Sequence, residues 1–319
     1  MLSSGLLRLV LYGINEVELF PSPRVRGEGQ GEGPLANKEA TPHPSPLPMQ
    51  TAHGERELED KEPEILMNNG FTTTISDGIA EIVINRPPVN ALNDAGWHAL
   101  ADEINRVGAS SEARVIVLRS EGRGFCAGVD IKELDKEPER IVSVNAGNYR
   151  SFEAVHRNPL PVIVAVHGFV LGGGIGLAGA ADIVVASDCA TFGVPEVDRG
   201  AMGGGAHLQR LFPVQKVRMM YFTGDSITAA EAYRLGAIEQ VVTKAELRDA
   251  ALAIAKKIAA KSTVMIRLAK ESLNGIEDGN LETKYRWEQG FTLQAYASKD
   301  SAETRRAFVE KRDAKFEGK

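Results

Sequence analysis

Cysteine is scarce in this 319-residue sequence, which contains only Cys126 and Cys189. A disulfide scaffold is therefore not expected. The two thiols predict a reducing, cytoplasmic compartment in which each acts as a small buried hydrophobe. Long apolar runs are also missing, since none reaches the roughly 18 residues that a membrane-spanning helix needs. We therefore expect no membrane segment.

Histidine and positive charge are limited as well. The six histidines are scattered without the spacing of metal ligands, and a formal net charge of −6 provides no basic surface for nucleic acid. The chain does contain 43% hydrophobic and 25% charged residues, which is typical of a globular protein with a large core. Neither a metal nor a nucleic acid is expected as a partner.

The first 66 residues differ in composition from the rest of the chain. Residues 20–64 are rich in proline, glycine and charge and follow no helical or strand period, so they cannot bury enough apolar surface to offset their ordering entropy. We predict disorder for residues 1–66. The apolar segment 6–20 resembles a signal sequence but is interrupted by acidic residues, and a short interfacial helix is the alternative.

Two pieces of this region, "PSPRVRGEGQGEG" and "PHPSPLP…HGERE", look like the translated arms of an inverted intergenic repeat. This likeness suggests that the assigned start is too early and that the native chain begins at Met67. Sequencing the N-terminus of natively expressed protein tests this hypothesis, and a mature start near Met1 would refute it.

From Phe71 onward the pattern alternates between strand and helix. "FTTTISDGIAEIVINRP" predicts a hairpin around Asp77-Gly78, and residues 93–109 show helical spacing. Buried strands are expected at 113–121, 161–168 and 182–188, with helices at 140–155 and 174–181 between them, and the last third is predominantly helical, with a long run over 280–315. The class is therefore α/β with a layered sheet.

The segment "GGGIGLAG", Gly172 to Gly179, contains a G-x-G-x-x-G match. A dinucleotide site would need a longer crossing helix before the next strand, and a phosphate loop would end in Gly-Lys-Ser/Thr; this chain has neither. Bare glycine backbone can instead leave N–H groups at a helix start free to stabilise an oxygen that becomes negative.

A second such segment is "RGFCAGVDIKEL", residues 123–134. Amides at Val129 and Gly173 could converge on one carbonyl oxygen and favour its enolate by several kcal/mol. Taken singly, each segment is more typical of an ordinary helix start. The candidate acid is Glu196 in "FGVPEVDRG", although an exposed glutamate would fit that turn too. Asp198, Arg199 and His207 follow nearby and are more typical of ion pairs or caps.

These motifs, together with "NRPPVNAL", "FTGDSITAAEAYRLGAIEQVV" and "AFVEKRDAKF", resemble the crotonase, or enoyl-CoA hydratase/isomerase, superfamily. The resemblance implies a crotonase-like ββα spiral core over 67–260 and a C-terminal helical trimerisation region over 261–319, giving a homotrimer or a dimer of trimers. It also implies that Val129 and Gly173 hold the carbonyl of a CoA thioester. Coenzyme A would belong to the substrate, with no separate cofactor.

The resemblance also reveals a departure from the family pattern. Family hydratases carry two glutamates, and Gly176 stands where the first is expected, while Glu196 matches the second. One carboxylate argues against efficient hydration, which needs both a delivered proton and an activated water. It suffices for an enoyl-CoA isomerase, or for activating water against a ketone.

A closer likeness favours the attack on a ketone. "EGRGFCAGVDIKEL", "ATFGVPEVDRGAMGGGAHLQRL" and "YRWEQGFTLQ" resemble actinobacterial steroid-degradation hydrolases that open a fused bicyclic β-diketone attached to CoA. In that interpretation Gly176 makes room for a ring system and Glu196 is the general base, with His207 or Asp198 as helpers. An isomerase or hydratase, and a scaffold without turnover, remain alternatives.

The same resemblance suggests where CoA binds. The CoA adenine and pantetheine would lie along the "DIKEL" segment, with Lys132 near the nucleotide and Lys311 reaching from the C-terminal helix of the same or a neighbouring subunit. The residues assigned to this site are Ala127, Asp130, Lys132 and Lys311.

Overall fold

The computed structural model describes residues 66–68, 70–277 and 280–315. Every described helix and strand belongs to the unit Glu59–Lys319. The predicted disorder of residues 1–66 falls outside the described residues apart from residue 66. The start at Met67 and the boundary at residue 260 stay predictions.

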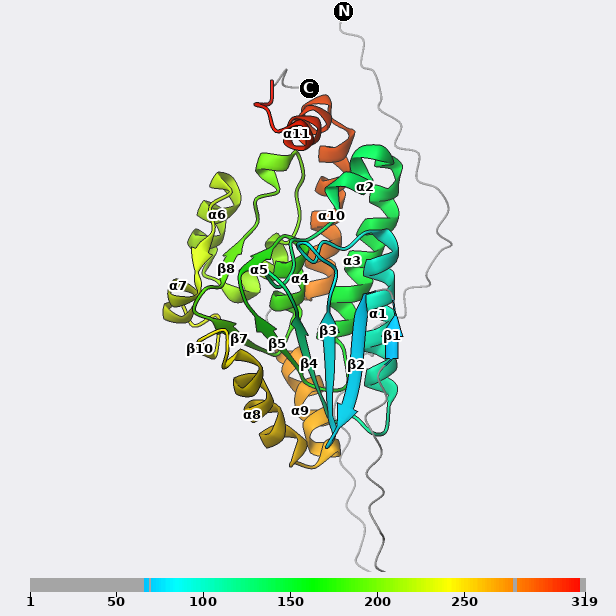
Figure 1. The fold of residues 1–319 in the computed structure, drawn as a ribbon, viewed down its shortest axis with the longest axis vertical. Coiled ribbons are helices and arrows are strands. Elements are labelled where there is room, and N and C mark those ends of the chain that lie inside the picture. The colour runs from blue at the N-terminus through cyan, green and yellow to red at the C-terminus, as the bar shows by residue number, and fades with distance from the viewer. Residues whose placement is uncertain (1–65, 69, 278–279, 316–319) are drawn as a thin grey trace, which may run out of the picture. The chain divides into compact units, whose positions relative to one another are not determined.

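A seven-stranded sheet forms the centre of the described unit, in the order β1-β2-β3-β4-β5-β7-β10 (Figure 1). Strands β1 to β3 pair antiparallel, and β3, β4, β5, β7 and β10 pair parallel. The strands of this sheet are Leu66–Asn68, Phe71–Ser76, Ile79–Ile84, Val115–Ser120, Val162–Val166, Ile183–Ser187 and Gln240–Val242.

A smaller sheet has the order β6-β8-β9, formed by Phe169–Leu171, Thr191–Gly193 and Ile227–Thr228. The sequence does not predict this sheet, because strands of two or three residues are too short to show a period. This sheet matters for the site, since β6 leads directly into the glycine segment.

The predicted hairpin is confirmed: β2 and β3 pair through Ser76 and Ile79, and both Asp77 and Gly78 have positive φ, 53° and 77°. Two central residues with positive φ are what the twist of a two-residue hairpin requires. The sheet strands predicted at 113–121, 161–168 and 182–188 are confirmed as β4, β5 and β7.

Eleven α-helices occur in the described residues. They are α1 Asp94–Ala109, α2 Ile131–Lys136, α3 Ile141–His156, α4 Gly173–Ala180, α5 Gly205–Leu211, α6 Val214–Thr223, α7 Ala229–Arg234, α8 Leu247–Ala259, α9 Thr263–Ile276, α10 Leu281–Ala297 and α11 Lys299–Glu310, with 3₁₀ turns η1 Pro138–Arg140 and η2 Val197–Arg199.

Capping explains where two of these helices begin. Asn93 accepts a hydrogen bond from the amide of Gly96 and starts α1 where the sequence predicts it. The prediction of a single helical run over 280–315 is wrong. Ser298 adopts extended backbone angles and caps α11 through the amide of Ser301, so the run divides into α10 and α11.

Helices cover both faces of the large sheet (Figure 1). On β4, Val115 and Val117 pack with Ala251 and Ala255 of α8, whereas Ile116 and Leu118 belong to the main core on the opposite face. Alternate residues of a strand point to opposite faces of the sheet. The sequence of a strand that is buried on both faces is therefore an unbroken apolar run.

The two cysteines differ in environment. Cys126 is buried, and burial raises the pKa of its thiol to about 12, as expected of an inert packing residue. Cys189 is exposed, which corrects the prediction that it would be buried. It lies in the turn after β7, where the amide of Ala190 bonds to the carbonyl of Ser187.

Candidate active site

A cavity of about 70 Å³ is lined by both glycine-containing segments and by the candidate acid. Its walls include Val129, Gly172, Gly173 and Glu196, and side chains from α3 and α10 complete them. The structure therefore brings together the three positions from which sequence analysis built its site. Ligand pockets usually span roughly 300–1,000 Å³, so a substrate must displace some of these side chains on entering.

The segment before Val129 is attached to the smaller sheet. Cys126 forms a bridge with Val170 of β6, and the Leu171 amide donates to the Cys126 carbonyl at 2.9 Å. Val129 in turn forms a bridge with Leu92. Backbone pairing on both sides of this segment thus fixes the position of the Val129 amide relative to the end of β6.

Gly128 and Gly173 meet where these segments cross. Gly128 has φ +87°, and a Cβ on it would lie 3.0 Å from the Gly173 amide nitrogen. Only glycine permits this approach. Neither the Val129 nor the Gly173 amide donates a hydrogen bond to any described residue, and Gly173 opens α4, where the first amides have no partner within the helix.

Glu196 lies against the first glycine of the segment. Gly172 has φ +52°, and a Cβ on Gly172 would overlap the Oε1 atom of Glu196. The other carboxylate oxygen, Oε2, is buried and has no hydrogen-bond partner among the described residues. Burial raises the pKa of Glu196 to about 8; Arg199 opposes this effect and the negative charge of Glu288 adds to it.

Sequence analysis did not identify Glu288 of α10, although it lies in the quoted segment "YRWEQGFTLQ". Its carboxylate accepts hydrogen bonds from the amides of Gly205 and Ala206, at 2.6 and 3.2 Å, and from the Tyr221 hydroxyl at 3.0 Å. The Tyr221 hydroxyl also accepts from the amide of Gly203, which lines the cavity. Glu288 therefore holds one cavity wall in place.

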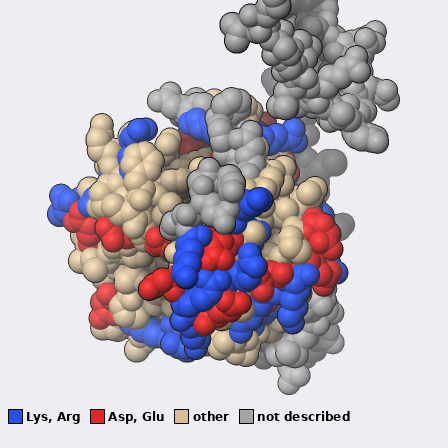
Figure 2. Space-filling view, turned by 90° about the horizontal axis from the view of Figure 1, so that it is seen from above, with Lys and Arg blue, Asp and Glu red and all other residues tan. Residues whose placement is uncertain are grey.

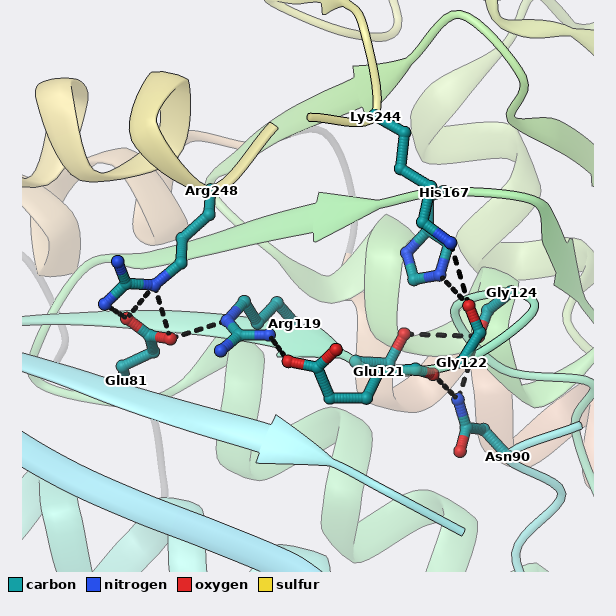
Figure 3. Close-up of polar contacts among 10 residues, drawn as sticks. Glu81, Asn90, Arg119, Glu121, Gly122, Gly124, His167, Lys244 and Arg248 are labelled. Carbon is teal, nitrogen blue, oxygen red and sulfur yellow. Dashed lines mark hydrogen bonds and ion pairs between the residues drawn. The ribbon is translucent and has the colours of Figure 1, made fainter. Parts of the chain in front are cut away.

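A second polar group fixes the turn that precedes the Val129 segment (Figure 3). Asn90 is buried in the left-handed conformation, with φ 53°. Its side-chain amide donates to the carbonyls of Glu121 and Gly124, each at 2.8 Å. The motif "NRPPVNAL" thus contributes hydrogen bonds that hold the neighbouring turn, a structural role that its residue types alone do not predict.

The same turn is held from its other side (Figure 3). Nε2 of His167 donates to the carbonyl of Gly122 at 3.0 Å, and Nζ of Lys244 donates to the same oxygen at 2.8 Å. Glu81 lies farther along the sheet, where it receives hydrogen bonds from Arg119 and Arg248. The bonds from His167 and Lys244 therefore hold the turn that precedes the Val129 segment.

The family model for enoyl-CoA hydratase/isomerase matches residues 74–319. The chain belongs to this family.

Individual relatives agree with the family assignment. The chain is 47% identical over 241 residues to a Rhodococcus jostii protein named "(7aS)-7a-methyl-1,5-dioxo-2,3,5,6,7,7a-hexahydro-1H-indene-carboxyl-CoA hydrolase", a match that covers 75% of this chain and 93% of the relative. The hydrolase of the same name from Mycobacterium tuberculosis is 45% identical over 242 residues, with 75% and 98% covered.

Solved structures show the fold. A carnitinyl-CoA hydratase from Mycobacterium avium superposes with a TM-score of 0.68 at 30% identity, covering 79% of this chain and all of that one. The predicted crotonase-like α/β fold of the family is therefore confirmed.

Gly176 departs from the two-glutamate pattern expected of family hydratases, but it does not open space for a ring. A Cβ on Gly176 would lie 2.5 Å from Cε1 of Phe152, so the phenyl ring of Phe152 already fills that volume. The expectation that this glycine makes room for a bicyclic substrate is wrong, because α3 packs its aromatic side chain into the gap.

Gly176→Ala is expected to lower the free energy of unfolding by about 1–3 kcal/mol, since overpacking against Phe152 outweighs the gain in helix propensity. Adding Phe152→Leu should recover part of the loss. Chemical denaturation measures both, with Gly275→Ala as a control, because a Cβ there has nothing within 4 Å. An unchanged stability for Gly176→Ala would contradict the packing described above.

The two predicted helpers of Glu196 do not line the cavity. His207 is buried behind Phe152, with ring centroids 4.7 Å apart, and burial lowers its pKa to about 3, so it is neutral at physiological pH. Asp198 is exposed, and its carboxylate lies beside Gly224. The structure therefore corrects the expectation that either side chain reaches the reacting atoms.

The four residues assigned to CoA occupy different places. Ala127 lines the cavity, while the side chain of Asp130 accepts from the Lys132 amide at 3.0 Å and caps α2. The side chain of Lys132 is exposed. Lys311 is also exposed, at the end of α11 with φ 55°, and does not line the cavity.

Charge on the surface is mixed. Figure 2 shows Lys and Arg interspersed with Asp and Glu on the face that it presents. The described part of the chain contains no cluster of three or more His, Cys, Asp or Glu side chains that could hold a metal. It also contains no helix that is both long and apolar enough to cross a membrane.

Proposed function

We propose that this protein hydrolyses a carbon–carbon bond in a fused bicyclic β-diketone attached to CoA, as part of steroid-type degradation. The observation that carries the proposal is that Glu196, whose buried Oε2 has no hydrogen-bond partner in the described part of the chain, lines the same cavity as Val129 and Gly173. The names of the Rhodococcus and Mycobacterium relatives, hydrolases of a bicyclic dione thioester, support the choice of substrate.

The first step is attack by water. The carboxylate of Glu196 takes one proton from a water molecule, and the hydroxide adds to a ring ketone carbon to form a tetrahedral alkoxide. A carboxylate whose pKa is about 8 is a stronger base than an ordinary glutamate, so its burial suits this task. No cofactor is required besides the CoA that the substrate carries.

The second step breaks the ring. The alkoxide collapses to a carboxylic acid, and the bond between the former ketone carbon and its ring neighbour breaks. The electron pair passes into the conjugated thioester, whose oxygen accepts hydrogen bonds from the amides of Val129 and Gly173. The proton held by Glu196 then returns to carbon, which restores the carboxylate and balances the addition of one water.

The alternative of alkene hydration has less support. It needs a second group to deliver a proton, and the position expected to carry that group is Gly176, which is packed against Phe152. An isomerase needs only one carboxylate, and the mass of the product distinguishes an isomerase from a hydrolase.

CoA would lie along the segment that contains Ala127 and Asp130, with Lys132 near the nucleotide. The exposed position of Lys311 suits a role toward the CoA of a neighbouring subunit. We accordingly propose a homotrimer or a dimer of trimers assembled through the C-terminal helices.

Mass spectrometry of a panel of acyl-CoA thioesters tests the function. A bicyclic β-diketone acyl-CoA should gain one water and one new carboxylic acid, and in ¹⁸O-water the label should enter that acid. A gain of water as an alcohol on an enoyl-CoA would instead mark a hydratase. An unchanged mass with a shifted double bond would mark an isomerase, and no change in any thioester would favour a scaffold.

The pH dependence of kcat/KM provides a separate prediction. Glu196 acts as a base only when it is ionised, and burial raises its pKa to about 8. The value of kcat/KM should therefore rise with pH and level off only above about pH 8. With an ordinary glutamate pKa it would level off at a lower pH. Steady-state kinetics across this range checks it, and a profile already flat from pH 6 upward would contradict the assigned role.

A further inference from the structure

The face of α3 that lines the cavity has an unusual composition, because it carries two asparagines. Ile141, Asn145, Asn148 and Phe152 all border the cavity. Their spacing of four, three and four residues places them in one stripe of the helix. Such a stripe is ordinarily apolar toward a core, so the two asparagines require an explanation.

Both asparagines are buried and incompletely bonded. Asn145 and Asn148 are each 7% exposed. Among the described residues, Nδ2 of Asn145 and Oδ1 of Asn148 have no hydrogen-bond partner. A buried polar atom without a partner reduces stability. These two atoms are one donor and one acceptor, and the residues that carry them line the same cavity as Glu196.

Contacts with α10 hold this face of α3 at its backbone and at the Asn148 side chain. Nε2 of Gln289 donates to the backbone carbonyl of Asn145 at 2.6 Å, and the side-chain amide of Asn148 reaches the hydroxyl of Tyr285. Tyr285 itself lines the cavity. α10 therefore fixes the backbone of α3 at Asn145 and the side chain of Asn148, and such contacts preorganise binding groups.

Ring opening creates two negative oxygens at different places. The thioester oxygen becomes negative when the carbon–carbon bond breaks, and the ketone oxygen becomes negative earlier, when hydroxide adds. These atoms belong to different carbons of the substrate, so one pair of amides cannot serve both. The ketone oxygen needs its own donor, fixed in advance in a site from which water is largely excluded.

We propose that Asn145 and Asn148 form a subsite for the ring ketone and its attacking water. Nδ2 of Asn145 donates to the ketone oxygen and then holds the alkoxide. Oδ1 of Asn148 accepts a hydrogen bond from one hydrogen of the water, while Glu196 removes the other. The subsite rests on the proposed function and defines its substrate class as acyl-CoA thioesters that carry a ring ketone within reach of the thioester.

The test compares Asn145→Leu with the wild-type protein. We expect kcat for ring opening to fall by about 10²–10³, the usual loss on removing one such donor. The melting temperature should stay unchanged or rise, because leucine removes an unpaired polar atom. Asn148→Leu should lower kcat as well, since the water loses an acceptor that orients it.

Asn158 provides a matched control. It is 3% exposed, but its Nδ2 donates to the carbonyl of Ile104 and its Oδ1 accepts from the amide of Leu160. Asn158→Leu should therefore lower the melting temperature, the opposite of the expected result at Asn145. A melting temperature that drops equally in both variants would assign Asn145 a structural role and overturn the subsite.

A second readout separates this inference from the proposed function. Exchange of the α-hydrogen of a ketone-free acyl-CoA into deuterated water needs Glu196 and the thioester donors but no ketone subsite. Asn145→Leu should keep this exchange within a few-fold of wild type. Ring opening at the wild-type rate, or an equal loss of exchange and ring opening, overturns the subsite alone. No ring opening by the wild-type protein overturns the proposed function together with it.

Discussion

Glu196→Gln is expected to lower kcat for ring opening by about 10²–10⁴, the usual effect of removing a general base, with little change in KM. Glutamine keeps the shape of the side chain, so the contact with Gly172 and the cavity wall should persist. Only the ability to accept a proton is lost. Steady-state kinetics on the bicyclic thioester measures the effect.

Stability provides an internal control for this variant. The carboxyl of Glu196 has a pKa of about 8 when folded, against an ordinary value of 4.5. Its contribution to stability is therefore fully present below about pH 4.5 and is lost as the pH rises through about 8. Glu196→Gln should remove that pH dependence, which thermal unfolding at several pH values can follow.

Glu239→Gln is the matched control, because Glu239 is exposed and does not line the cavity. It should leave kcat unchanged. Wild-type turnover by Glu196→Gln would remove this residue from the mechanism, whatever the stability data show.

Gly173→Ala is expected to lower kcat by about 10²–10³, through displacement of a backbone donor. The new Cβ would lie 2.5 Å from Cζ2 of Trp97, which is fully buried and cannot move away freely. It would also lie 3.4 Å from Cα of Gly128, against the segment that supplies the second donor. The first turn of α4 must therefore shift, and the two amides separate.

Gly275→Ala serves as the control for this prediction too. The site is an exposed position of α9 where an added Cβ meets nothing within 4 Å, so activity should not change. Circular dichroism and a melting curve establish whether Gly173→Ala remains folded. A folded Gly173→Ala protein with unimpaired turnover would contradict the donor role of this amide.

Much of the fold could be predicted from the sequence, because its signals are local. The Asp77-Gly78 pair specifies a hairpin turn, the Asn93 side chain caps a helix, and the apolar run 115–118 indicates a strand buried on both faces. Each of these depends on neighbouring residues and on backbone preferences that a short segment carries by itself. The strands of the smaller sheet, two or three residues long, carry no such signal.

The sequence by itself determined the α/β class, the two glycine-containing segments and Glu196 as the candidate acid. Tertiary structure alone decided that Phe152 fills the space beside Gly176 and that His207 lies behind it. It also decided that two asparagines of α3 line the cavity, each with one buried polar atom that no described residue pairs. The physical reason is that burial and hydrogen-bond pairing depend on segments far apart in the chain, which meet only when the fold is complete.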